Sequence, residues 1–132
     1  MGQSMPGRFL SLRVKRLRRV WPAVRIIFRG DSGFCRWRVL AWCEHQGVGY
    51  IVGIAKNKRL NRIIEEALTQ AEQEVAELDH KVRRFVEFDY KAASWDHHRR
   101  VMAKIEVTDK CRNPRYVLTN LTGDPETLYD KL

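Results

Sequence analysis

The stretch VRIIFRGDSGF, residues 24–34, places a β-branched run directly before a glycine-rich turn. Residues 24–28 have the length and composition of a strand, and residues 29–33 carry the turn-forming glycine, aspartate and serine. The pattern therefore predicts a buried strand that ends at a turn. Ser32 is a residue type that caps the first turn of a helix.

A helix and a second strand are expected after this turn. Apolar residues recur at helical spacing over residues 34–46, and Gly47 supplies a C-terminal stop. Residues 48–55 are a second apolar run of strand length. Strand, helix and strand in this order predict a βαβ unit, whose two strands pair in parallel with a right-handed crossover.

The flanking segments extend this unit on both sides. Residues 12–20 fit a short, basic amphipathic helix that Pro22 ends, and residues 59–78 form the clearest helical stripe in the chain. Beyond residue 78 the apolar period changes from 3.6 to 2, which predicts three antiparallel strands. These strands are expected over residues 82–90, 101–108 and 116–121, and a last helix begins near residues 123–126. The fold class expected is α/β (α+β).

Charge is distributed unevenly along the 132 residues. Residues 1–60 carry 13 Lys and Arg against two carboxylates, whereas residues 61–132 carry 12 against 14. Such a basic half indicates an anionic partner, most often nucleic acid. The cations expected to contact DNA are Arg13, Lys15, Arg16, Arg18, Arg19, Arg36 and Arg38.

Two aromatic residues beside basic ones have two interpretations. Trp95 and Tyr116 could stack on nucleobases. The alternative is that both rings pack against the antiparallel sheet. We include both residues in the predicted DNA-binding set and keep the packing alternative open.

Several function classes lose support from the sequence. No apolar run approaches the roughly 20 residues that span a bilayer, so a membrane protein is not expected. Three cysteines without ligand spacing fit neither a disulfide scaffold nor a zinc site. The glycine and serine motifs of dinucleotide enzymes, serine hydrolases and P-loop NTPases are missing. The expected location is the cytoplasm.

Asp31 is the candidate catalytic residue. It follows the carboxyl end of a predicted parallel strand, where ligands of open α/β sheets bind. A carboxylate there could hold a divalent ion, although a metal site for phosphoryl transfer needs several converging carboxylates. The alternative is that Asp31 accepts hydrogen bonds from turn amides before a helix.

A family resemblance lies in residues 24–34, in AWCE at 41–44, in GYIVGIAKN at 49–57 and in NPRYVLTNL at 113–121. These stretches resemble the DDE transposases of bacterial insertion sequences, and the resemblance spans roughly residues 13–132. It implies an RNase H-like fold with a largely β insertion, a bacterial source and DNA as the partner. It also makes Asp31 the second acid of a catalytic triad that binds Mg²⁺ or Mn²⁺.

The sequence departs from the family pattern at the other two acids. No strand carrying the first aspartate is evident before residue 24, and the helix carrying the glutamate is expected after residue 132. Two-metal catalysis needs carboxylates that hold both ions, so one acid cannot reproduce it. We therefore expect a transposase fragment that is inactive alone and binds no metal, with homo-oligomerisation left open. The alternative is a small, basic, non-catalytic nucleic-acid-binding module.

This interpretation divides the chain into four regions. Residues 1–23 form a basic N-terminal helix region, and residues 24–58 form the βαβ part of the RNase H-like core. Residues 59–121 combine a helix with the antiparallel insertion. Residues 122–132 begin a C-terminal helix.

Overall fold

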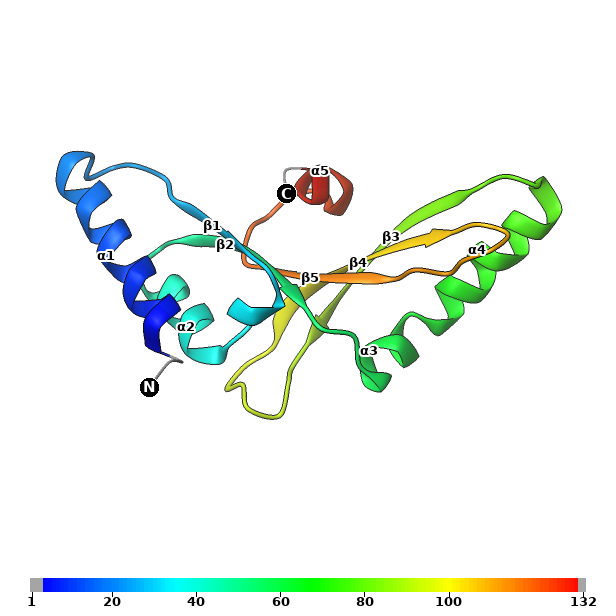
Figure 1. The fold of residues 1–132 in the computed structure, drawn as a ribbon, viewed down its shortest axis with the longest axis horizontal. Coiled ribbons are helices and arrows are strands. Elements are labelled where there is room, and N and C mark those ends of the chain that lie inside the picture. Colours follow the sequence, from blue (N-terminus) through cyan, green and yellow to red (C-terminus); the bar gives the residue numbers. More distant parts are fainter. Residues whose placement is uncertain (1–3, 131–132) are drawn as a thin grey trace.

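The computed structural model describes residues 4–130, in which five strands form one mixed sheet (Figure 1). The spatial order is β1-β2-β5-β4-β3. The strands are β1 (Ile27–Gly30), β2 (Gly49–Ile54), β3 (Val82–Tyr90), β4 (Arg99–Val107) and β5 (Arg115–Thr119). Residues 1–3 and 131–132, at the ends of the first and last predicted regions, lie outside the described residues.

The predicted βαβ unit is confirmed. Strands β1 and β2 pair in parallel, with Gly30 opposite Val52, and α2 (Trp37–His45) connects them. The pairings β5–β4 and β4–β3 are antiparallel, as the change of period predicted, and β2 also pairs antiparallel with β5, a pairing that the sequence did not predict. The antiparallel strands therefore continue the same sheet as the βαβ unit.

The first strand differs from its prediction in position and burial. It was expected to be buried over residues 24–28, but β1 begins at Ile27 and extends to Gly30. Its residues alternate between exposed and half-buried, and Ile27 is 38% exposed. The physical reason is that β1 has a neighbour on one side only, so an apolar composition does not by itself make it a central strand.

The helix expected over residues 34–46 begins later. Residues Ser32–Phe34 form a short 3-10 helix, η1, and α2 starts only at Trp37. Arg36, at the position before α2, makes no side-chain capping bond. The turn after β1 therefore has its own small helix.

The long helical stripe is divided into two helices. The structure has α3 (Lys58–Ile63) and α4 (Glu65–Leu78), which meet at Ile64. Ile64 is 1% exposed, so the apolar stripe continues through the break. Asn57 starts α3 by accepting a 2.8 Å hydrogen bond from the Leu60 amide at its Oδ1.

The N-terminal helix is longer and less buried than predicted. It extends over Ser4–Val20 as α1, whereas residues 12–20 were expected. Of its predicted apolar positions, Val14 is buried at 3% exposure, but Leu12, Leu17 and Val20 are exposed. Among residues 10–20, the apolar side chains that pack against the core are therefore Val14 and the partly buried Leu10.

The core lies on both faces of the sheet. One large cluster joins the βαβ unit, α3, α4 and the antiparallel strands. A small cluster on the opposite face consists of Ile51, Met102, Val117 and Leu128, the last from α5 (Pro125–Asp130). Figure 1 shows α5 across the sheet from α2, α3 and α4. Among the described helices, none is both long enough and apolar enough to span a membrane.

Candidate active site

Asp31 lies at the carboxyl end of the parallel pair, immediately after β1. Its Oδ1 accepts a 2.9 Å hydrogen bond from the Gly33 amide, which caps η1. The alternative interpretation, in which Asp31 accepts hydrogen bonds from turn amides, therefore describes a contact that is present in the structure. The residue is nevertheless exposed, so its position leaves it accessible to a ligand.

Two glycines fix the surroundings of Asp31. A Cβ atom at Gly30 would lie 2.8 Å from Cδ2 of Phe34, whose ring packs edge-on against Phe28. A Cβ atom at Gly53, on β2, would lie 3.4 Å from the Ser32 amide nitrogen. The turn that carries Asp31 therefore packs closely against both parallel strands.

The described residues do not provide a complete site for Mg²⁺ or Mn²⁺. Within residues 4–130, no group of three or more His, Cys, Asp or Glu side chains converges. Such ions are held by carboxylates and phosphates around a near-octahedral shell, and Asp31 alone supplies one carboxylate that already accepts a hydrogen bond. The residues present do not fit the metal centre that the resemblance implies.

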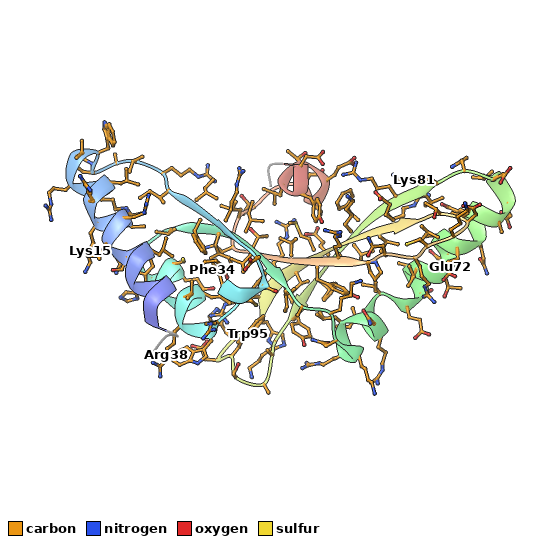
Figure 2. The ribbon with its side chains drawn as sticks, in the orientation of Figure 1. Lys15, Phe34, Arg38, Glu72, Lys81 and Trp95 are labelled. Atoms are coloured by element: carbon orange, nitrogen blue, oxygen red, sulfur yellow. The ribbon has the colours of Figure 1, made fainter. Side chains whose placement is uncertain are left out.

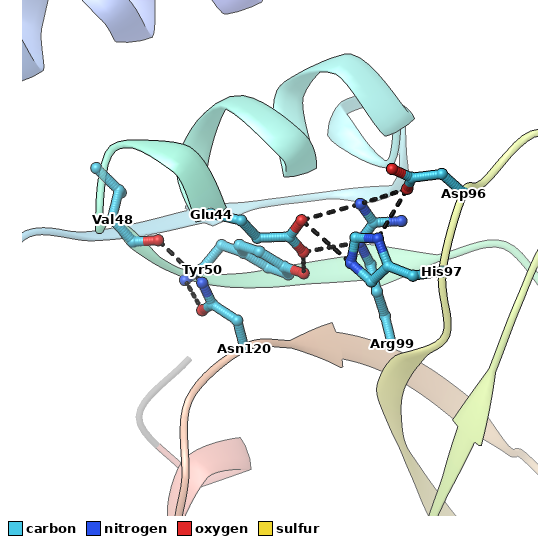
Figure 3. Close-up of polar contacts among 7 residues, drawn as sticks. All are labelled: Glu44, Val48, Tyr50, Asp96, His97, Arg99 and Asn120. Carbon is cyan, nitrogen blue, oxygen red and sulfur yellow. Dashed lines mark hydrogen bonds and ion pairs between the residues drawn. The ribbon is translucent and has the colours of Figure 1, made fainter.

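Glu44, which belongs to α2, forms an ion pair and hydrogen bonds with other side chains of the protein (Figure 3). The buried Arg99 guanidinium donates to both of its oxygens, from Nε at 2.7 Å and from Nη2 at 3.0 Å. The Tyr50 hydroxyl donates to the same carboxylate at 2.7 Å. This network joins α2, β2 and β4.

The connection between β3 and β4 closes this network. His97 Nε2 lies 3.3 Å from Glu44 Oε1, and His97 Nδ1 lies 2.7 Å from Asp96 Oδ1. Burial raises the pKa of Glu44, but the hydrogen bonds from Arg99 and Tyr50 outweigh it, so the pKa of this carboxyl lies below its ordinary value. Glu44 is therefore ionised at neutral pH and paired with a cation.

The predicted DNA-contacting cations lie mainly on α1 and around α2. Lys15 and Arg38 lie at the end of the molecule that these helices form (Figure 2). The exposed members are Arg13, Lys15, Arg16, Arg19, Arg36 and Arg38.

Arg18, Arg36 and Arg38 are among the predicted cations that also make contacts within the protein. Arg18 donates to the carbonyls of Gln46 and Gly47, at the end of α2. Arg36 donates to the Gly33 carbonyl at 3.2 Å, and the Arg38 guanidinium lies 5.3 Å from the centre of the Trp37 ring. Arg18 is thus part of the contact between α1 and α2.

The two predicted stacking residues are enclosed by protein. Trp95 is 5% exposed and Tyr116 is 3% exposed. Trp95 packs against Tyr90 and beneath the Arg99 guanidinium, and the Tyr116 hydroxyl donates to Asn61 at 2.6 Å. Their rings fill the core as the packing alternative described, and no face is available to stack on a base.

A basic cleft was missed by the sequence analysis. It has a volume of about 540 Å³ and lies between α3, the start of α4 and the loop that follows β4. Its cations are Lys56, Lys58, Arg62 and Arg112. The signal was present in the segment AKNKRLNR, residues 55–62, but the contribution of Arg112 depends on tertiary structure.

One family model, described as transposase DDE domain group 1, matches residues 2–132. The chain belongs to this family. The mixed sheet with its covering helices is consistent with the RNase H-like fold that the resemblance implied, and the family supports a transposase-type function for this DDE domain. No curated protein and no solved structure gave a significant match.

Proposed function

We propose that this DDE domain serves DNA strand transfer in transposition, with Asp31 as one carboxylate of the metal site of the complete enzyme. The observation that carries the proposal is the exposure of Asp31 at the carboxyl end of the parallel strands β1 and β2, within the residues that the family model matches. Ligands of open α/β sheets bind at this end. Mg²⁺ or Mn²⁺ is the metal that we assign to it.

We also propose that residues 1–132 do not cut or join DNA by themselves. Since the described part of the chain brings no group of three or more His, Cys, Asp or Glu side chains together, further carboxylates must come from other segments. Glu44 is not such a ligand because Arg99 already occupies both of its oxygens.

DNA is held, in this proposal, by the exposed cations of α1 together with Arg36 and Arg38. Each phosphate contact releases a counterion, so affinity for duplex DNA should fall steeply with salt and depend little on sequence. Oligomerisation and a bacterial cytoplasmic location are part of the same proposal.

The test is metal-dependent nicking and joining of DNA that carries the ends of the element. Residues 1–132 should be inactive in Mg²⁺ or Mn²⁺, and Asp31→Asn should leave folding and DNA binding unchanged. In an extended enzyme that contains the other two acids, Asp31→Asn should abolish strand transfer. The matched control is Asp89→Asn, which neutralises an exposed carboxylate on β3 and should leave strand transfer intact.

Two results contradict the proposal. Metal-dependent nicking by residues 1–132 that Asp31→Asn removes would show that the chain is active alone. Strand transfer by the extended enzyme despite Asp31→Asn would remove Asp31 from the site.

A second candidate is a non-catalytic nucleic-acid-binding module. The observation that favours it is the combination of an accessible basic cleft with the lack of an acid cluster in residues 4–130. It predicts salt-dependent DNA binding together with an extended enzyme that is inactive whichever residue occupies position 31.

A further inference from the structure

Four positively charged side chains line the cleft beside α3. Lys56 comes from the segment after β2, Lys58 and Arg62 from α3, and Arg112 from the loop after β4. One carboxylate, Glu65, also lines it. Four cations that converge around one acid produce a positive potential that the concave shape concentrates.

Among the described residues, several cations of the antiparallel strands and their connections are engaged in ion pairs, whereas two of the cleft cations are not. Lys81 and Lys104 pair with Glu106, and Arg100 pairs with Glu87. In contrast, neither Lys58 nor Arg62 has an ion-pair partner among residues 4–130.

The remaining two cleft cations are only partly engaged. Lys56 contacts the neutral Asn113 amide oxygen at 3.4 Å, and Arg112 contacts Glu72 at 3.3 Å with both side chains well exposed. An exposed pair of this kind contributes little to stability, so Arg112 loses little by turning to another anion. The cleft can therefore bind an anion without first breaking a buried ion pair.

The walls of the cleft are held in place by the core. Leu60 and Leu68 are buried, and the Tyr116 hydroxyl ties Asn61 of α3 to β5. On the other wall, the backbone N–H of Asn113 donates to the Glu106 carbonyl at 3.1 Å. Because these anchors are independent of any ligand, the cations are positioned before a ligand arrives.

The cleft opens from the same end of the sheet as Asp31. Strands β1 and β2 are parallel, Asp31 directly follows β1, and Lys56 follows β2 by two residues. Figure 1 shows η1 and α3 leaving this end of the two strands. A polyanion held in the cleft therefore lies on the side of the molecule where Asp31 is exposed.

We infer that this cleft binds backbone phosphates of DNA through Lys56, Lys58, Arg62 and Arg112. Arginine contacts phosphate through two parallel N–H groups and lysine as a point charge, so the set suits successive phosphates rather than a single small anion. The inference deepens the proposed function, on which it rests, by naming where the DNA backbone is held. None of these residues belongs to the set predicted from the sequence.

The test measures duplex DNA binding by residues 1–132 at several salt concentrations. The double variant Lys58→Ala with Arg62→Ala removes two cations four residues apart on an exposed helix face, and alanine preserves the helix. The slope of log affinity against log salt should become shallower by about 2, or about 1 for each lost phosphate contact. The cleft variant should retain its circular dichroism spectrum.

Two matched variants separate position from net charge. Lys81→Ala with Arg84→Ala removes the same charge from exposed residues that already pair with Glu106 and Glu74, and the slope should stay near the wild-type value. Lys15→Ala with Arg19→Ala tests α1 at the same four-residue spacing. Equal changes in all three variants would show that binding follows net charge and would overturn the inference.

A gain-of-affinity variant protects the test from misfolding. Glu65→Gln removes the acid that lines the cleft and keeps its size, so DNA affinity should rise several-fold at low salt. An unfolded protein does not produce this result. Unchanged affinity in this variant, together with an unchanged slope in the cleft double variant, overturns the inference.

Cys111 provides a direct measure of proximity. Its thiol is exposed next to Arg112, whereas Cys43 is buried. A photoreactive group on Cys111, in a Cys35→Ser background, should cross-link DNA. The same group on Thr122→Cys, with Cys111→Ser added, should not, because exposed Thr122 lies in the loop that leads from β5 to α5, and α5 lies across the sheet from α3 (Figure 1).

The outcomes for the cleft and for strand transfer are separable. Wild-type DNA binding with an unaffected cleft variant overturns this inference and leaves the proposed function standing. A shallower slope in the cleft variant, with no strand transfer by the extended enzyme, supports this inference and contradicts the proposed function. Undetectable DNA binding at low salt overturns the inference, while strand transfer still decides the function.

Discussion

Arg99 is a buried cation that pairs closely with Glu44 and more distantly with the exposed Asp96, whose Oδ1 lies 3.8 Å from Arg99 Nη2. Its side chain is 2% exposed, and Glu44, at 24%, receives two of its N–H groups. Its Nη1 has no partner within residues 4–130. An ion pair in this position contributes less through its own attraction than through the cost of leaving one member unpaired.

We therefore expect Glu44→Gln to destabilise the protein by about 3 kcal/mol at neutral pH, since the buried Arg99 charge loses its close partner and keeps only the exposed Asp96, 3.8 Å away, among the described residues. The measurement is urea unfolding followed by circular dichroism. The control is Glu87→Gln, which removes an exposed partner of Arg100 and should cost at most about 1 kcal/mol. Equal losses in the two variants would contradict this account.

The same pair predicts a dependence of stability on pH. The pKa of Glu44 in the folded protein lies below its ordinary value. The stability that the ionised Glu44 contributes is therefore fully present above the unfolded pKa of about 4.3 and is lost as pH falls below that value. The difference between wild type and Glu44→Gln should therefore be constant near neutral pH and should shrink below about pH 4. A difference that persists in acid would exclude the ionised carboxylate as its cause.

Residue positions were predictable where they depend on the local chain. Asp31 is where the turn composition placed it, because the end of a strand and the start of a helical turn are encoded by a few neighbouring residues. Trp95 and Tyr116 were not predictable in this way. Whether an aromatic ring faces solvent depends on its tertiary contacts. Trp95 contacts Arg99, which belongs to β4, and Tyr116 contacts Asn61, which is distant in the sequence.

At the scale of elements, the described side chains of α1, residues 10–20, bury little apolar surface. Among residues 10–20 of α1, the buried side chain is Val14. The Arg18 guanidinium donates hydrogen bonds to the Gln46 and Gly47 carbonyls at the end of α2. Leu12, with 63% exposure, lies on the open side. The helix should therefore detach without unfolding the sheet.

We expect Val14→Asp to open α1. The loss of a buried valine side chain costs about 1.5–3 kcal/mol, which raises the detached population about tenfold or more. Trypsin should then cleave the basic residues of α1 faster, while the unfolding midpoint of the sheet changes little. Leu12→Asp is the control and should leave cleavage near the wild-type rate. A loss of the whole fold in Val14→Asp would show that α1 belongs to the cooperative core.

Element boundaries followed from the sequence only where a residue type marks them. Asn57 marks the start of α3 through its side-chain cap, but Ile64 interrupts the long helix although it is apolar and lies on the buried stripe. The position of β1 at a sheet edge was equally inaccessible, because an apolar run does not reveal how many neighbours a strand has. The basic cleft was missed for the same reason, since Arg112 joins Arg62 only after the chain folds.

At the scale of the whole molecule, one sheet joins segments that the sequence pattern separates. Strand β2 of the βαβ unit pairs with β5, which pairs with β4. The large core cluster contains Leu40 from α2 and Ile105 from β4, and both are 0% exposed. An opening of either half therefore exposes apolar surface of the other.

We expect residues 24–58 and residues 59–121 to unfold together as one cooperative unit. Leu40→Ala and Ile105→Ala should each cost about 2–5 kcal/mol, because each leaves a cavity in the shared core. Both should shift a single transition, with coincident curves from tryptophan fluorescence and far-ultraviolet circular dichroism. Leu78→Ala, at an exposed position, is the control and should shift the curve little. Two separate transitions, each moved by only one substitution, would instead place a domain boundary near residue 58, and the pairing of β2 with β5 would then have to break before the rest of the sheet.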